Sequence, residues 1–184
     1  MGYTIRPART RDVPMIGKLI DSNVESGRLL SKATVTLYED IQEFCVAELD
    51  GDSSLAGCGA LHVMWEDLAE IRTVAVAPAC QGLGIGHGIV GELLARARVL
   101  GVDRVFCLTF AVGFFARHGF RTISGTPVAA EVYSELLRSY DEGVAEFLDL
   151  ERVKPNTLGN TRICLLYTSP SPRDRTRSRM PSSA

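Results

Sequence analysis

Glycines at alternate positions mark residues 74–89, VAVAPACQGLGIGHGI, as the segment of this chain best suited to chemistry. Gly82, Gly84, Gly86 and Gly88 leave backbone N–H groups open to close approach by a ligand. The apolar run before them predicts a buried strand, and the run after them predicts a helix. A helix that begins beside such a loop directs unpaired N–H groups and the positive end of its dipole at one point. This arrangement favours an anion, and most naturally a phosphate.

Two other phosphate-binding motifs fit this segment less well. A dinucleotide-binding fingerprint can be placed on Gly86, Gly88 and Gly91, but it requires an acidic residue at the end of the next strand. Here the next apolar run ends in Thr109 and Phe110. The phosphate loop of nucleotide hydrolases is excluded because the sequence contains no Gly-Lys-Ser/Thr. A glycine-rich surface turn that binds nothing is the plain alternative.

Two motifs resemble those of one enzyme superfamily. Residues 81–86, QGLGIG, preceded by VAP at 76–78, resemble the acetyl-CoA pyrophosphate loop of the GNAT acetyltransferases, Q/R-x-x-G-x-G/A. Residues 114–120, FFARHGF, resemble the F-Y-x-x-x-G-F box of the same superfamily, in which a short helix packs along the CoA arm. An ordinary amphipathic helix ended by Gly119 would also explain the second segment. Together, with a helix and a strand between them, the two motifs predict a GNAT fold.

Within this superfamily, residues 3 to about 163 are most similar to the stand-alone bacterial N-acetylglutamate synthases of arginine biosynthesis. The resemblance implies transfer of an acetyl group from acetyl-CoA to the α-amino group of L-glutamate or L-glutamine. It is carried by GRLL at 27–30 with Lys32, EIRTVAV at 70–76, LTF at 108–110, VKPN at 153–156 and NTR at 160–162.

The resemblance also implies which residues hold the co-substrate, acetyl-CoA. The backbone of Val74, Ala75 and Val76 would hold the pantetheine arm, with one N–H donating to the thioester oxygen as it gains charge. Many members of the superfamily have a tyrosine that protonates the departing thiolate where this chain has Phe115, so no general acid is assigned. By the same resemblance, the pyrophosphate would be bound by the loop residues Gln81, Gly82, Leu83, Gly84, Ile85, Gly86 and His87.

The acceptor amine must lose a proton before it can attack, because free amino groups are largely protonated near neutral pH. A base, or a water relayed to one, is therefore expected. Glu70 is the candidate, since bases of this superfamily often lie on the fourth strand; a solvated carboxylate is the alternative. Arginine matches a carboxylate in two hydrogen bonds. Candidates for the substrate carboxylates are Lys32, Arg72 and Arg162, for each of which a solvated surface charge is the plain alternative.

Composition limits the class of protein. A chain of 184 residues with 46% hydrophobic and 23% charged residues is typical of one globular domain. No apolar run reaches membrane-spanning length, and the N-terminus lacks a signal-peptide pattern, so no membrane partner is expected. The five cysteines form no C-x-x-C pair. We therefore expect no metal site and no disulfide framework, and a cytoplasmic location.

Residues 164–184 differ in character from the rest of the chain. They are rich in Ser, Pro and Arg, and resemble one translated frame of a sequencing adapter, which predicts a non-native, disordered tail after a GNAT domain at 1–163. A genuine basic tail that binds nucleic acid or membrane is the alternative. Without the tail, 16 basic and 21 acidic residues remain, a net charge of −5 that argues against a nucleic-acid partner. The resemblance alone allows a homodimer.

Hydrophobic periodicity and turn signals predict an α/β fold with a mixed, six- to seven-stranded sheet flanked by helices. The predicted order is β-α-α-β-β-β-α-β-α-β, an antiparallel meander followed by a parallel crossover around the helix after the glycine loop. Strands are expected at 3–7, 44–49, 54–64, 69–76, 104–109, 120–123 and 161–166. Helices are expected after an N-cap at Thr10, with Asp12 in the first turn, at 35–42, from the glycine loop to about 100, at 113–118 and at 128–137.

Two other functions stay open at this stage. The chain could acetylate another amine, such as a protein N-terminus or a polyamine, and its acidic body would suit a cationic acceptor. It could also be a non-catalytic CoA-binding sensor, which the missing tyrosine favours. Release of CoA with a panel of amines distinguishes the three hypotheses.

Overall fold

A mixed sheet forms the centre of the molecule, with strands in the order β1-β2-β3-β4-β5-β7-β6. The computed structural model describes residues 2–24, 29, 32–51, 54–125, 128–139, 141, 144, 148 and 160–167. The strands are β1 (Tyr3–Pro7), β2 (Phe44–Leu49), β3 (Leu55–Trp65), β4 (Leu68–Val76), β5 (Arg104–Thr109), β6 (Arg121–Thr122) and β7 (Thr161–Leu166). The helices are α1 (Val13–Val24), α2 (Thr34–Glu39), α3 (Ile85–Val99), α4 (Val112–Ala116) and α5 (Ala130–Leu136), with 3-10 turns η1 (Thr10–Asp12), η2 (Ile41–Glu43) and η3 (Pro78–Cys80). The predicted mixed sheet is confirmed.

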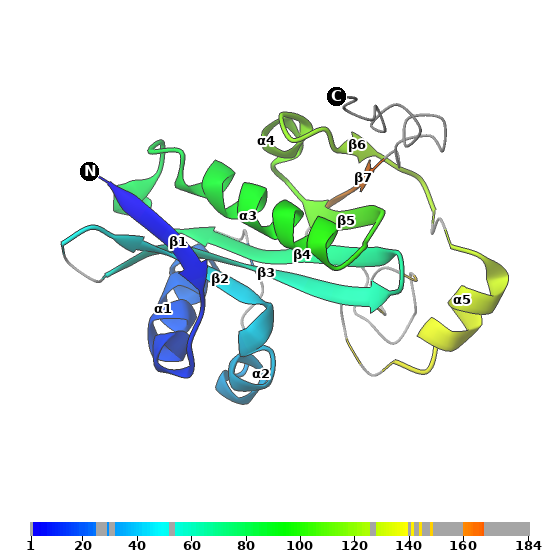
Figure 1. Ribbon diagram of the computed structural model, residues 1–184, viewed down its shortest axis with the longest axis horizontal. Helices are drawn as coiled ribbons and strands as arrows, with labels where there is room; N and C mark the ends of the chain where they lie inside the picture. The colour runs from blue at the N-terminus through cyan, green and yellow to red at the C-terminus, as the bar shows by residue number, and fades with distance from the viewer. Residues whose placement is uncertain are drawn as a thin grey trace, which may run out of the picture.

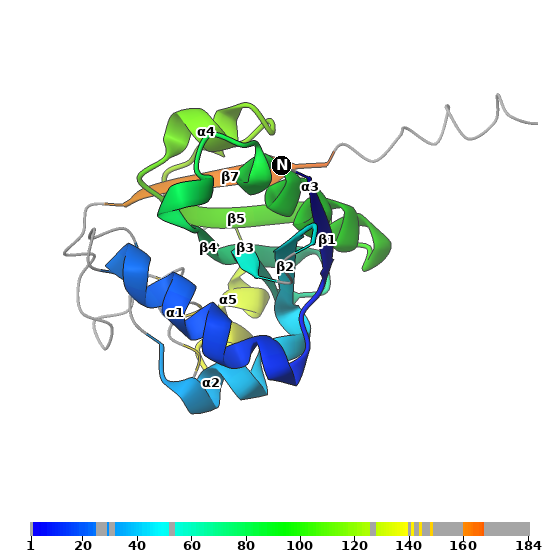
Figure 2. The same ribbon diagram turned by 90° about the vertical axis from the view of Figure 1, so that its left-hand side faces the viewer.

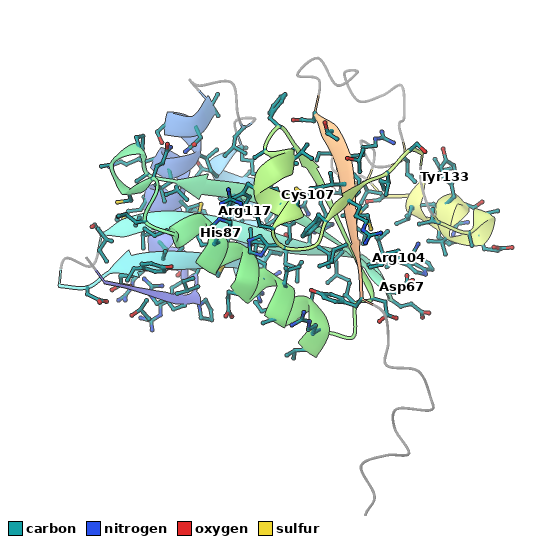
Figure 3. The ribbon with its side chains drawn as sticks, turned by 90° about the horizontal axis from the view of Figure 1, so that it is seen from above. Asp67, His87, Arg104, Cys107, Arg117 and Tyr133 are labelled. Atoms are coloured by element: carbon teal, nitrogen blue, oxygen red, sulfur yellow. The ribbon has the colours of Figure 1, made fainter. Side chains whose placement is uncertain are left out.

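Strands β1 to β4 form the predicted antiparallel meander, and β5 runs parallel to β4. A parallel neighbour requires a crossover, which α3 supplies. The start of β5 is tied to the β3–β4 turn, because the Arg104 guanidinium donates to both carboxylate oxygens of Asp67 at 2.9 Å (Figure 3). The backbone N–H of Arg104 also donates to the Asp67 carbonyl. These contacts set β4 and β5 side by side at their first residues.

Helices cover both faces of the sheet. Helices α3 and α4 lie on one face, and α1 and α2 lie on the other (Figures 1 and 2). The apolar stripe predicted for α1 is buried, with Val13, Ile16, Leu19 and Ile20 in the core. The inner face of α3 is likewise buried in the core. None of the helices in the described residues is long and apolar enough to cross a bilayer.

Gly59 on β3 allows α3 to approach the sheet closely. A Cβ atom at this position would lie 2.6 Å from Ile89 Cγ2 and 3.1 Å from Leu93 Cδ1. Real Cβ atoms do not approach that closely, and close-packed interiors cannot absorb the extra methyl. The glycine therefore sets the distance between the sheet and the helix that carries the glycine loop.

Most predicted elements agree with the structure to within two residues, and the differences have local causes. The second helix ends at Glu39 and not at Gln42, because Asp40 leaves helical geometry (φ −94°, ψ 8°) and the 3-10 turn η2 follows. Strand β6 covers only Arg121–Thr122, since Phe120 turns into the core. Helix α5 begins at Ala130, two residues later than predicted.

Strand β7 continues past residue 163, where the sequence predicts the domain to end. It pairs with β5 up to Leu166 opposite Arg104. Tyr167 follows, with its hydroxyl 3.2 Å from the Leu94 carbonyl and its ring 4.7 Å from the Arg98 guanidinium carbon. The predicted boundary thus falls inside a paired strand. Residues 168–184 lie outside the described part of the chain, so the origin of the tail stays a prediction.

Candidate active site

Strand β4 carries a bulge at the point where it leaves β5. Its register with β3 shifts between the pairs Cys58–Ala75 and Ala60–Arg72, so β4 has one residue more than β3 there. Thr73 lies at this point with φ 60°, which is an outlier for a β-branched residue. A bulge bends its strand. Described pairing between β4 and β5 ends at Glu70, and the strands separate beyond it.

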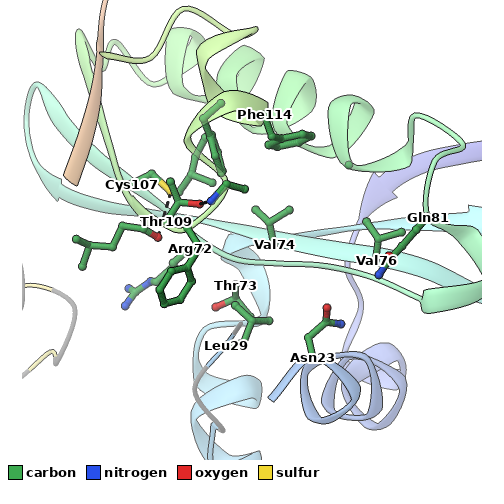
Figure 4. A pocket seen from close by; sticks show the side chains of 16 residues that line it. Asn23, Leu29, Arg72, Thr73, Val74, Val76, Gln81, Cys107, Thr109 and Phe114 are labelled. Carbon is green, nitrogen blue, oxygen red and sulfur yellow. Dashed lines mark hydrogen bonds between the residues drawn. The ribbon is translucent and has the colours of Figure 1, made fainter. Parts of the chain in front are cut away.

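A cavity of about 580 Å³ opens where β4 and β5 separate, a size usual for small-molecule sites. Figure 4 shows its two sides. Val74, Val76, Gln81 and Phe114 lie toward the glycine loop. Gly86, in the first turn of α3, and Phe115, in contact with Phe114, belong with them. Asn23, Leu29, Arg72 and Thr73 lie toward α1 and α2, and residues 107–111 at the end of β5 complete the wall. We call the first group the loop side and the second the arginine side.

The loop side has the geometry expected of an anion site. Gly82 and Gly84 have φ values of 80° and 79°, and a Cβ atom at either would meet nothing within 4 Å. Gly84 is the N-cap of α3 and has no side chain to cap the first N–H groups of the helix. The open space above the loop and the uncapped helix end are suited to a phosphate group.

The four alternate glycines have different roles, which spacing alone does not reveal. Gly86 lies within α3, where a Cβ atom would make ordinary contact, 3.4 Å from the Phe114 ring. A Cβ atom at Gly88 would lie 2.8 Å from Ile5 Cδ1 on β1. Gly88 therefore allows α3 to pack closely against β1. Gly82 and Gly84 are the two of these glycines that adopt positive φ.

Two histidines meet beside the loop side. His87 Nδ1 lies 2.9 Å from His118 Nε2, and the His87 ring lies 4.5 Å from the Phe114 ring, centre to centre. Burial, and then the neighbouring His87, lower the pKa of His118. His118 therefore stays neutral at neutral pH. The sequence places these residues in two separate motifs and does not predict their contact.

Phe115 lies on the cavity wall, buried and edge-on to Phe114 and Phe120. It has no hydroxyl to donate a proton. Two other wall residues, Thr109 and Cys107, carry polar atoms to which the sequence assigned no role. Thr109 accepts a hydrogen bond from the Ala111 amide at Oγ1, and its hydroxyl is free to donate elsewhere.

Cys107 lines the same wall, but it is not suited to act as a nucleophile. Burial, and then the charge of Glu70, raise the pKa of its thiol well above the ordinary value. A neutral thiol is a poor nucleophile. The described residues contain no group of three or more His, Cys, Asp or Glu side chains that could hold a metal ion.

Of the predicted charged residues, the described cavity wall includes Arg72. Burial lowers the pKa of Arg72, but the charges of Glu70, Asp141 and Glu43 outweigh this and raise it above its ordinary value. The guanidinium Nη1 lies 3.0 Å from Asp141 Oδ2, and Nη2 lies 3.5 Å from Glu43 Oε2. Arg72 is therefore a fixed, permanently charged cation at the arginine side.

The other predicted residues lie farther from the described wall. Glu70 is buried on β4 opposite Phe106 of β5, and it is not a wall residue. Lys32 precedes α2, and Arg162 lies in β7 opposite Leu108; neither lines the described cavity. Residues 25–28, 30–31 and 149–159, which include parts of the predicted substrate segments, lie outside the described residues.

Comparisons with known proteins point to one family. The family model of the Acetyltransferase (GNAT) family matches residues 20–120, which contain both motifs. The chain is 61% identical over 164 residues to the amino-acid acetyltransferase of Mycobacterium tuberculosis, covering 88% of this chain and 93% of that protein. A crystal structure of a Mycobacterium tuberculosis protein in complex with CoA and NLQ matches with a TM-score of 0.86 and 60% identity, over 90% of this chain and 99% of that one.

A longer enzyme matches in part. The N-acetylglutamate synthase of Neisseria gonorrhoeae, in a structure complexed with coenzyme A and N-acetyl-glutamate, has a TM-score of 0.71 and 27% identity. The match covers 92% of this chain but 36% of that one, so this chain spans about a third of the longer enzyme.

Proposed function

Because this chain belongs to the GNAT family of acetyltransferases, we propose that it transfers the acetyl group of acetyl-CoA to the α-amino group of L-glutamate or L-glutamine. This reaction would place it at the first step of arginine biosynthesis. The observation that carries the proposal is Arg72, a partly buried cation on the wall of a cavity whose opposite side is a glycine loop with the geometry of an anion site.

The loop side fits the co-substrate. The uncapped N–H groups at the start of α3 would bind the pyrophosphate, and the absence of Cβ atoms at Gly82 and Gly84 leaves room for it. Beyond the Thr73 bulge, the backbone of Val74 and Val76 borders the cavity, away from the described pairing with β5. These groups would hold the pantetheine arm, and one N–H would stabilise charge on the thioester oxygen. Acetyl-CoA itself supplies the activated acyl group.

The arginine side fits the acceptor. Nη2 of Arg72 is buried and donates no hydrogen bond within the described part of the chain. A buried donor without an acceptor costs about 1–3 kcal/mol, and a ligand is one way to satisfy it. A carboxylate of the amino acid would accept this bond and place the α-amino group toward the gap between β4 and β5.

Glu70 would accept the proton of the amine through an intervening water, because its carboxylate is buried behind the wall. Its charge acts on both Cys107 and Arg72, which line the cavity, so it lies within electrostatic reach of the acceptor. Phe115 has no proton to give. The CoA thiolate would leave without one, as its moderate pKa permits.

One observation favours a different acceptor. Two carboxylates, Asp141 and Glu43, lie within 3.5 Å of the Arg72 guanidinium, and this surplus of negative charge would suit a polyamine. We therefore keep a cationic acceptor as the second candidate.

Release of CoA from acetyl-CoA, measured with L-glutamate, L-glutamine, spermidine and a short peptide, tests the proposal. We expect turnover with the amino acids. Loss of a charged hydrogen bond in Arg72→Ala should raise the KM for the amino acid about 10- to 100-fold. Glu70→Gln should lower kcat about 10²- to 10⁴-fold. Arg138→Ala, at an exposed arginine on the surface, is the matched control. Turnover restricted to spermidine or the peptide would refute the amino-acid acceptor.

A further inference from the structure

The Arg72 guanidinium belongs to a cluster of four side chains from different parts of the chain. Glu43 comes from η2, His62 from β3, Arg72 from β4, and Asp141 follows α5. Glu43 Oε1 lies 2.6 Å from His62 Nδ1, and Asp141 Oδ2 lies 4.0 Å from His62 Nε2. The cluster therefore links the arginine side of the cavity to the segment after α5.

Asp141 is held in place independently of Arg72. Its Oδ1 accepts a hydrogen bond from the Val144 amide at 2.9 Å, and its own amide lies 3.1 Å from Ser139 Oγ. Leu136 before it and Val144 after it are buried in one apolar cluster with Leu68 of β4. Burial opposes ionisation of Asp141, but the charge of Arg72, the Val144 amide and the Arg72 hydrogen bond outweigh it and lower the pKa.

Asp141 engages one edge of the guanidinium. Nη1 of Arg72 makes both contacts with the carboxylate, at 3.2 Å to Oδ1 and 3.0 Å to Oδ2. Nη2 makes neither of them, and its distance to Glu43 Oε2 is 3.5 Å without hydrogen-bond geometry. One nitrogen is thus hydrogen-bonded to Asp141, while the other has only the longer ion pair with Glu43 and no hydrogen bond in the described part of the chain.

We propose that Asp141 is a positioning residue for the acceptor, which holds Arg72 so that its Nη2 is presented to the carboxylate of the amino acid. This inference rests on the proposed function. Arginine has a long side chain that loses much rotamer freedom when it is ordered. An anchored carboxylate that orders it beforehand lowers this cost at the moment of binding, which is the effect of preorganisation.

Displacement of Asp141 by the substrate is the opposite role, and the geometry disfavours it. Moving the carboxylate away would break its bond with the Val144 amide and disturb the buried neighbours on both sides. Leaving it in place keeps both hydrogen bonds to Nη1 and requires no rearrangement of the protein, so the only cost to the acceptor is repulsion between the two carboxylates, which the Arg72 charge offsets.

The test separates positioning from a general structural effect. Asp141→Asn removes the charge while it keeps the shape, and should raise the KM for L-glutamate and L-glutamine at least fivefold. The KM for acetyl-CoA and kcat should stay within twofold. Glu135→Gln, an exposed carboxylate on α5 that pairs with Arg138, is the matched control and should change none of these values. A parallel rise in the KM for acetyl-CoA would overturn positioning in favour of a structural role, and a fall in the KM for the amino acid would show that Asp141 competes with the substrate.

A second pair of variants tests whether Asp141 acts through Arg72. Arg72→Lys keeps the charge but has no planar fork, so it should raise the KM for the amino acid by itself. In that background Asp141→Asn should add less than a twofold change, because residues that act through one another are not additive. An equal effect in both backgrounds would overturn the inference.

Side-chain ¹⁵N NMR of the arginines, without any substrate, makes the test independent of the acceptor. The Arg72 signals, assigned by their absence in Arg72→Lys, should show slow rotation of the guanidinium in the parent chain and faster rotation in Asp141→Asn. Unchanged signals in Asp141→Asn would refute positioning whatever the enzyme acetylates. If instead Arg72→Lys leaves amino-acid turnover intact, the role of Arg72 in the proposed function fails, and the NMR result still decides whether Asp141 orders it.

Discussion

The left-handed conformation of Gly84 yields a quantitative prediction for a Gly84→Ala variant. Gly84 has φ 79° and ψ −2° at the N-cap of α3, and a Cβ atom there would meet nothing within 4 Å. The cost of the substitution in the free protein is therefore conformational and not steric. An L-residue in this region is less stable by about 1–2 kcal/mol. For a chain of this size, about 2–4 °C of Tm is lost per kcal/mol, so Tm should fall by about 2–8 °C.

Two other glycines, one just after α3 and one inside it, serve as matched controls. Gly101, just after the helix, has φ 81° and also has open space around its Cβ position, so Gly101→Ala should lower Tm by a similar amount. Gly86 lies inside the helix, where alanine is favoured by up to about 1 kcal/mol, and its new Cβ atom would make ordinary contact with Phe114. Gly86→Ala should therefore leave Tm unchanged or raise it.

Binding of CoA separates Gly84 from Gly101. Gly84 lies in the loop where the phosphate is expected, so displacement of one N–H donor should cost about 1.5–3 kcal/mol, or about 10- to 100-fold in Kd. Gly101 lies at the far end of the helix, and its variant should bind CoA as the parent does. Thermal melts and isothermal titration with CoA measure both effects. A Gly84→Ala variant with unchanged Tm would refute the conformational argument, and equal loss of CoA binding in Gly101→Ala would refute the assignment of the loop.

Three further substitutions test other parts of the structure. Asp12→Asn removes the charge of a buried carboxylate that pairs with the partly exposed Arg6, whose Nη1 lies 2.7 Å away, and should destabilise the fold by about 1–3 kcal/mol in chemical denaturation. Gly59→Ala places a methyl 2.6 Å from Ile89 Cγ2, so it should cost about 1–3 kcal/mol; a variant as stable as the parent would show that α3 can move outward freely. His118 has a pKa lowered by burial and by the neighbouring imidazole, so between that pKa and about 6.5 the unfolded chain binds more protons. Its contribution to stability is lost as the pH falls below about 6.5, and His118→Gln should lose less Tm than the parent between pH 7.5 and 5.5; an identical loss would contradict the lowered pKa.

Local signals in the sequence were sufficient for most of the fold. The apolar stripe of α1 has the helical period, and the stripe is buried as predicted. The meander and the parallel crossover follow from short turns and one long helical connection, and both are confirmed. Element ends were predicted less well: Asp40 and Phe120 leave the regular geometry because of their surroundings, which periodicity does not encode.

The loop geometry from which an anion site is predicted was also accessible from the sequence, because glycine spacing before a helix reports backbone geometry directly. The role of each glycine was not, since Gly88 faces Ile5, which lies more than eighty residues earlier in the chain. Phe115 was correctly identified as lacking a proton to donate. Thr109 belongs to the LTF segment that carries part of the resemblance, but neither it nor Cys107 was assigned a role, and only the structure places both on the cavity wall.

By itself, the sequence determined the order of the elements, the buried faces and the backbone geometry of the glycine loop, because all of these depend on residues close together in the chain. The tertiary structure alone decided which residues surround the arginine side of the cavity. Thr73 adopts φ 60°, and the sequence has no neighbouring glycine or proline that would predict this conformation. Packing on both sides of β4 overrides the local preference of a β-branched residue. Arg72 meets Asp141 across 69 positions of the chain, and His87 meets His118 across 31. Contacts of that separation arise from the closing of the sheet and its helices around a common core, which no local pattern records.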